Sequence, residues 1–170
     1  MIITLKKVKI NDRASEETTH FTADIYADGK LVGYAKNDGH GGSTDYYPVD
    51  GKRAALTQLE IWCQNQPGIV YQYEGKPYTM RPSLENTVDE IISKKVDENA
   101  AKKSQQQLNR SMLKGILYLI EGDPQPWVTS WKGKTLAKML ETVKGQSIVL
   151  KKIEEIKAAG HKILNTNLNV

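Results

Sequence analysis

Residues 21–36, FTADIYADGKLVGYAK, hold the clearest folding signal in the chain. Two runs of alternating apolar and polar residues flank Asp28-Gly29, a dipeptide that favours a type I′ turn whose twist matches that of both strands. Pairing the strands about this turn sets Ile25 opposite Val32. The sequence therefore predicts a β-hairpin with one buried face, made of Phe21, Ala23, Ile25, Val32 and Tyr34.

The segments around this hairpin predict further strands and a helix. Residues 3–10 alternate lysines with aliphatic residues and favour a strand. After the hairpin, residues 69–80 predict a second hairpin with Glu74-Gly75-Lys76 at its tip. A helix is expected from about residue 52 to residue 64, with Asp50 as its N-cap. Its apolar residues repeat at helical spacing: Ala55, Leu56, Leu59, Trp62 and Cys63.

The second half of the chain begins with a helix and then loses its apolar residues. Ser83 is expected to start that helix, and residues 97–107, DENAAKKSQQQ, have almost nothing to bury. Residues 115–122 predict a central strand, paired with a strand near residues 127–131. Two helices follow, the first capped by Thr135, and a short strand closes the chain.

Tight hairpins favour antiparallel sheets and an α+β class, with β-sheet hairpins packed against several amphipathic helices. We predict an N-terminal portion of hairpins and helices over residues 1–96 and a polar helical connector over 97–113. A C-terminal portion with a hairpin and helices is expected over 114–170. These parts form one compact domain or two small subdomains.

Composition excludes some classes of function. The 170 residues carry a net charge of +4 and one cysteine, Cys63, which we expect in the core. No apolar run reaches the roughly 18 residues that span a bilayer, and no signal-peptide pattern is present. We expect a cytoplasmic protein without a membrane partner. The spacing of the histidines and the single cysteine predicts no metal site, and no cofactor is expected.

A glycine-rich stretch, NDGHGGSTDYY, follows the first hairpin at residues 37–47. Successive backbone N–H groups in such a loop can converge on an anion, but the spacing fits neither GxGxxG nor GxxxxGK[ST]. His40, Ser43 and Asp45 are the residue types of a hydrolytic triad, yet lie too close in sequence to predict one, so no catalytic residue is expected. The loop is a sharp turn, a protein contact or an anion site. Its candidate binding residues are Lys36, Asn37, Gly39, His40, Gly41, Gly42, Ser43, Tyr46 and Tyr47.

Basic residues later in the chain offer a second candidate surface. They line one predicted helix, where they position phosphates without reading sequence. Acidic residues are interleaved, aromatic residues are sparse, and no helix-turn-helix, zinc finger or RRM signature is present. A DNA-binding module therefore remains an alternative. The candidate contacts are Lys94, Lys95, Lys102, Lys103 and Arg110.

The segments SEETTHFTADIYADGKLVGYAKNDGHGGSTDYY (15–47) and KILNTNL (162–168) resemble a family of small proteins of phages and mobile elements of gut bacteria. The shared pattern is Ser-x-Glu-Thr, a hairpin with a glycine turn, and Asn-x-Gly-x-Gly-Gly. Some phage proteins of this kind are anti-CRISPR inhibitors of type II-A Cas9. The resemblance implies a non-enzymatic inhibitor that binds Cas9 or another bacterial defence protein, with or without guide RNA or DNA. The alternatives are a nucleotide- or phosphate-binding anti-defence protein that uses the glycine loop, and the DNA-binding module.

Overall fold

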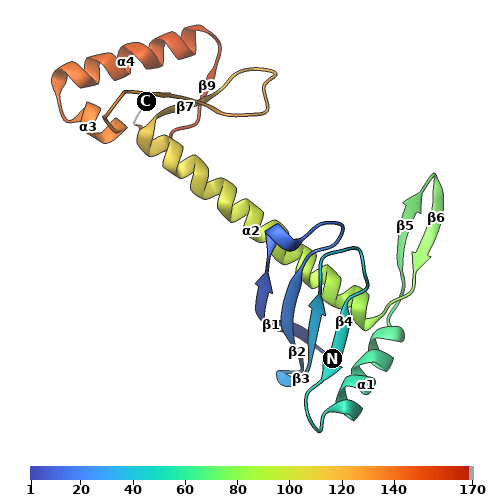
Figure 1. The fold of residues 1–170 in the computed structure, drawn as a ribbon. Helices are drawn as coiled ribbons and strands as arrows, with labels where there is room; N and C mark the ends of the chain where they lie inside the picture. Colours follow the sequence, from blue (N-terminus) through green and yellow to red (C-terminus); the bar gives the residue numbers. More distant parts are fainter. Residues whose placement is uncertain (169–170) are drawn as a thin grey trace. The chain divides into compact units, whose positions relative to one another are not determined.

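The computed structural model describes residues 1–168 of the chain. Helices and antiparallel sheets make up the fold, which confirms the predicted α+β class (Figure 1). The chain divides into two compact units, Met1–Glu98 and Asn99–Val170. The predicted C-terminal portion runs to residue 170, so its last two residues, 169 and 170, lie outside the described residues.

A four-stranded antiparallel sheet forms the centre of the first unit, with its strands in chain order (Figure 1). The strands are β1 (Ile3–Ile10), β2 (Phe21–Ala27), β3 (Lys30–Asn37) and β4 (Asp45–Pro48). A 3₁₀ turn, η1 (Asp12–Ala14), follows β1. The predicted first strand and the hairpin about Asp28-Gly29 are both confirmed.

One extra residue in β3 changes the predicted face of Tyr34. Next to the turn the pairing is as expected, but the register shifts by one, so that Ile25 lies opposite Gly33 instead of Val32. A β-bulge of this kind moves every later side chain of the strand to the other face. Ala35 is therefore buried where Tyr34 was expected, and Tyr34 is exposed. The other four predicted core residues of the hairpin are buried as expected.

Two helices cover the inner face of the sheet. Helix α1 (Arg53–Gln64) packs Leu56, Leu59 and Cys63 into the core. Cys63 is buried, which confirms the expected core position of this cysteine, and burial raises the pKa of its thiol. The predicted N-cap, Asp50, was wrong: Lys52 holds that position without a side-chain hydrogen bond, and the helix begins at Arg53. The buried core of the unit is Phe21, Ala23, Ile25, Val32, Ala35, Leu56, Leu59, Cys63, Leu84, Val88 and Ile92.

The second predicted hairpin is formed by β5 (Ile69–Tyr73) and β6 (Lys76–Met80). Its turn has two residues, Glu74 and Gly75, and both have positive φ, as a type I′ turn requires. Lys76 therefore belongs to β6 and not to the turn.

Helix α2 (Leu84–Lys114) runs without a break through the predicted polar connector. Ser83 caps its start, since the Ser83 hydroxyl accepts a hydrogen bond from the N–H of Asn86. The first turns bury Leu84, Val88 and Ile92 against the sheet, whereas the middle of the helix is exposed all round. The division between the two units falls inside this helix.

The second unit holds a three-stranded sheet of order β8-β7-β9 and two helices. Its elements are β7 (Gly115–Leu119), β8 (Trp127–Ser130), α3 (Leu136–Leu140), α4 (Val143–Ala158) and β9 (Lys162–Ile163). The predicted strand at residue 115 is central, and Thr135 caps α3 as expected. The side-chain amide of Asn165 joins β7 to the end of α2 through Leu117 and Met112. The core of the unit is Ile116, Leu136, Met139, Val149, Ile153 and Ile156.

Gly33, next to the bulge in β3, has no space for a side chain. A Cβ there would lie 2.7 Å from the Tyr47 carbonyl oxygen and 3.1 Å from a Leu56 methyl group. We expect Gly33→Ala to lower the free energy of unfolding by about 1–3 kcal/mol in urea titrations, because this overpacking has no space to relax into. Gly42→Ala is the control, because a Cβ at Gly42 meets no atom within 4 Å. Equal stability of the two variants would contradict the proposed role of Gly33.

Candidate functional site

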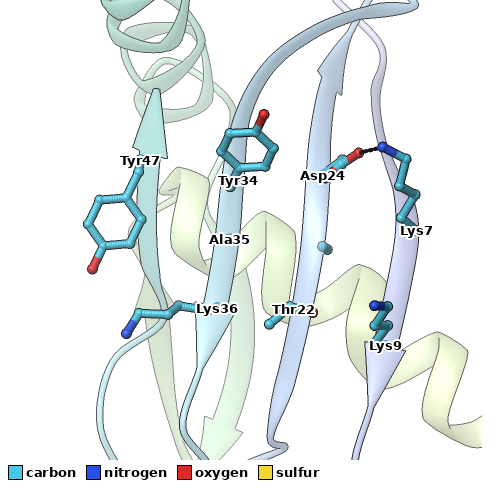
Figure 2. A pocket seen from close by; sticks show the side chains of 9 residues that line it. Lys7, Lys9, Thr22, Asp24, Tyr34, Ala35, Lys36 and Tyr47 are labelled. Carbon is cyan, nitrogen blue, oxygen red and sulfur yellow. Dashed lines mark ion pairs between the residues drawn. The ribbon is translucent and has the colours of Figure 1, made fainter. Parts of the chain in front are cut away.

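The outer face of the four-stranded sheet, opposite the helices, carries an open groove of about 300 Å³ (Figure 2). Strands β1 to β4 all contribute to it, and the helices lie behind the sheet in this view. We call it the outer groove. Its lining residues are Lys7, Lys9, Thr22, Ala23, Asp24, Tyr34, Ala35, Lys36 and Tyr47.

Two tyrosine rings form one end of the outer groove. Tyr34 and Tyr47 are paired across β3 and β4, so their side chains share the outer face. They are 44% and 49% exposed, respectively. Rings held this way on a sheet present flat apolar surfaces to solvent. Further along the same sheet, the Lys6 ammonium lies 4.2 Å from the centre of the Tyr26 ring.

Away from the tyrosines, the charged residues of the groove are lysines and one aspartate. Strand β1 has its own bulge, where Lys7 takes a positive φ of 49°. The bulge lets Lys7 reach Asp24, whose Oδ2 atom lies 3.0 Å from the Lys7 Nζ atom (Figure 2). This interaction raises the pKa of Lys7. The Asp24 Oδ2 atom is itself buried, and the Lys7 ammonium is the charged group beside it.

Sequence reasoning found two residues of this groove, Lys36 and Tyr47, and missed the others. The lysines of β1 had a visible signal, because they alternate with aliphatic residues and must lie on the face opposite the core. Tyr34 was assigned to the wrong face by the undetected bulge. Lys36 lies 3.9 Å from both Asp38 and Asp45, at the far end of β3.

The glycine loop is tied to residues 15–20 by several hydrogen bonds. Asn37, which is buried, accepts hydrogen bonds from the Thr18 hydroxyl and from the N–H of Gly39. The N–H of Gly41 donates to the Thr18 hydroxyl. The carbonyl of Gly39 accepts from the N–H groups of Glu16 and Thr18. The two motifs that carry the family resemblance thus form one hydrogen-bonded unit.

These bonds change what the glycine loop can offer an anion. The N–H groups of Gly39 and Gly41 already have acceptors, Asn37 and Thr18 respectively, so they do not form a ready anion site. The His40 ring is exposed, and its Nδ1 atom lies 3.0 Å from a carboxylate oxygen of Glu16. Ser43 is exposed as well. This geometry best supports a structural role for the loop, which is to hold the reversal of the chain between β3 and β4.

A buried polar contact joins the end of the loop to α2. The Thr44 hydroxyl donates to an Asp89 carboxylate oxygen at 2.6 Å, and the N–H of Thr44 donates to Glu85 at 3.1 Å. Burial raises the pKa of Asp89, and the nearby charge of Glu85 adds to that effect. The hydrogen bond from Thr44 acts in the opposite direction. Ionising the Asp89 carboxyl therefore costs more free energy in the folded chain than in the unfolded chain.

The remaining candidates lie in two places. Tyr46 points to the inner side, where burial and then a hydrogen bond to Glu60 raise its pKa to about 12. It is therefore separated from Tyr47, on the opposite face.

The other predicted contacts are exposed along α2, and the Lys94 ammonium pairs with Glu90 at 2.6 Å. Those contacts are Lys94, Lys95, Lys102, Lys103 and Arg110.

Within residues 1–168, no group of three or more His, Cys, Asp or Glu side chains is placed to hold a metal ion. None of the described helices is long and apolar enough to cross a membrane. The chain matches no protein-family model, no curated protein and no solved structure in comparisons with known proteins. The fold and the outer groove therefore define the chain as an α+β protein with a sheet face lined by tyrosines and lysines.

The raised pKa of Asp89 predicts how stability depends on pH. The folded state holds this proton more tightly than the unfolded state, so ionisation of Asp89 lowers stability as pH rises from 3.8 through the higher folded pKa. Asp89→Asn avoids that cost and keeps an oxygen acceptor for Thr44. We expect the variant to be at least as stable as the natural chain at neutral pH in urea titrations, with its advantage shrinking towards pH 3.8. A variant that is clearly less stable at neutral pH would contradict this account.

Proposed function

We propose that this chain is a non-enzymatic binding protein whose outer groove contacts single-stranded nucleic acid. The observation that carries the proposal is the pair of exposed tyrosines, Tyr34 and Tyr47, beside Lys9 and Lys36 on one sheet face. Single strands are bound by aromatic side chains on which bases stack, together with a positive groove that follows the backbone. Exposed sheet faces are common platforms for such stacking.

The charges of the sheet face support phosphate contact of modest strength. Lys6, Lys7, Lys9 and Lys36 lie on it, whereas the aspartates on it are Asp24 and Asp45. Lys7 is paired with Asp24 at 3.0 Å, whereas Lys36 lies farther, at 3.9 Å, from Asp38 and Asp45, so Lys9 and Lys36 are the main candidates for phosphate contact. Such contacts position a strand without reading its sequence. We place this activity in the bacterial cytoplasm, where single-stranded DNA and RNA both occur.

The outer groove makes a specific prediction for binding of labelled dT10 by fluorescence anisotropy. Tyr34→Ala and Tyr47→Ala should each weaken binding by about 1–3 kcal/mol, because each removes a stacking platform. Lys9→Gln and Lys36→Gln should each lower the slope of log K against log salt by about 0.7, because each removes one phosphate contact.

Two control variants separate the groove from other surfaces. Tyr73→Ala removes an exposed tyrosine from the β5–β6 hairpin and should leave dT10 binding unchanged. Lys102→Gln tests the alternative contact surface on α2. If Lys102→Gln weakens binding more than Lys9→Gln or Lys36→Gln does, the interface lies on α2 and not on the sheet.

Inhibition of Cas9 is a second candidate. The observation that favours it is the hydrogen-bonded unit of residues 15–18 and 37–42, because these are the two motifs that carry the family resemblance. At the surface of that unit, Glu16 and His40 form an exposed pair suited to a protein contact. The third candidate, nucleotide binding by the glycine loop, stays a prediction, and the internal bonds of the loop do not favour it.

The Cas9 proposal is tested by co-elution of the purified chain with Cas9–guide complexes and by inhibition of target cleavage. We expect binding at about one chain per complex, weakened in a Glu16→Ala/His40→Ala double variant. The matched control is Glu74→Ala, which removes an exposed charge from the β5–β6 hairpin, outside that unit. Absence of both co-elution and inhibition with several type II-A Cas9 proteins would reject this candidate.

A further inference from the structure

One row of side chains crosses the outer groove from β1 to β3. Thr22 of β2 is paired with Lys9 on one side and with Lys36 on the other. Residues paired in this way point to the same face of the sheet, with their Cβ atoms about 4.5–5.5 Å apart. All three line the groove, and Figure 2 shows Thr22 between the two lysines. The row therefore places one hydroxyl group between two ammonium groups on flexible stems.

The donors of this row are available to a ligand. Thr22 is exposed, and in the part of the chain that the structure describes neither its hydroxyl nor the Lys9 ammonium has a hydrogen-bond or ion-pair partner. The Lys36 ammonium comes no closer than 3.9 Å to Asp38 and Asp45. Lysine and threonine side chains are both common donors to phosphate oxygens. Two ammonium groups and one hydroxyl around one point suit a phosphate that presents three free oxygens.

The sheet changes character on either side of this row. Asp45 ends the row on β4, opposite Lys36, and Asp38 follows at the end of β3. Carboxylates repel phosphates, so a nucleic-acid strand is not expected to continue in that direction. In the other direction, two residues or about 7 Å along the strands, lie the rings of Tyr34 and Tyr47. The row is therefore suited to the last phosphate of a strand whose adjoining base lies on the tyrosines.

We propose that the outer groove binds the phosphorylated end of a single strand, and this inference rests on the proposed binding of single strands. The terminal phosphate lies among Lys9, Thr22 and Lys36. The end base stacks on Tyr34 and Tyr47. A terminal phosphate carries a charge of about −2 at neutral pH, whereas a phosphate inside a strand carries a single charge. Two ammonium groups on one phosphate therefore favour an end over an internal position.

The test measures binding of the full chain to strands with a fluorescent label on a central base, which keeps both ends free. The strands are dT10 with hydroxyl ends, dT10 with a 5′-phosphate, dT10 with a 3′-phosphate, and dT12. The last has about the same total charge as phosphorylated dT10, so it controls for charge alone. We expect at least one phosphorylated strand to bind at least about fivefold more tightly than dT12. The preferred end identifies whether the phosphate is a 5′- or a 3′-phosphate.

The variant Thr22→Val tests the row with little change in side-chain size. It should lower the preference for the phosphorylated end by about twofold or more, because the phosphate loses the donor between the two ammonium groups. Thr79→Val is the matched control, since Thr79 is exposed on β6, outside the groove lining. It should leave the preference unchanged.

The outcomes distinguish this inference from the function on which it rests. If the natural chain binds none of the four strands, the proposed function fails. If the phosphorylated strands bind no better than dT12, or if Thr22→Val keeps the full preference, the inference of a terminal-phosphate site is overturned and single-strand binding stands. In that second case, Lys9 and Lys36 contact phosphates along the strand without selecting its end.

Discussion

The close approach of β3 to α1 at Gly33 is the constraint on which the first unit depends. A side chain at Gly33 would meet both the Tyr47 backbone and Leu56, so the strand and the helix can approach only with glycine there. The chain accommodates one extra residue at this point, and the register of β3 shifts. From there onwards, each side chain lies on the face opposite to that of an unbroken strand. Ala35 then fits beneath the helices, and Tyr34 is left beside Tyr47 on the outer face.

A second constraint acts where β3 leaves the sheet. Asn37 is buried and fixes the loop through hydrogen bonds to Gly39, Gly42 and Thr18. Thr44 continues this network to Asp89 on α2. Buried polar groups are costly unless their hydrogen bonds are satisfied, so such a network favours one arrangement of the loop over others. The glycine loop is therefore an ordered part of the fold. It positions β4, and with it Tyr47, next to β3.

Local patterns were enough to predict most elements but not how they pack. The Asp28-Gly29 turn, the apolar stripe of α1 and the cap at Thr135 are decided by neighbouring residues, and all three were found. The close packing at Gly33, next to the bulge in β3, involves Leu56, which lies more than twenty positions along the chain. The bonds that occupy the glycine loop come from Thr18, and the anchor of Thr44 comes from Asp89. Long-range contacts of this kind leave no local pattern in one sequence. The sequence therefore could not show that the glycine N–H groups of the loop already have acceptors, and most residues of the outer groove were missed.

The two faces of the sheet have opposite requirements, and the bulge satisfies both. The inner face needs small or aliphatic residues, because α1 and the first turns of α2 pack closely on it. Burying the Tyr34 ring there would require the helices to move away from the sheet. On the outer face the same ring gives up part of its hydrophobic stabilisation, since it remains nearly half exposed. That loss is compatible with stability because the aliphatic core lies elsewhere, and it leaves an aromatic surface next to lysines. The exposure of these rings, which stability alone does not require, is the observation on which the proposed binding role of this face rests.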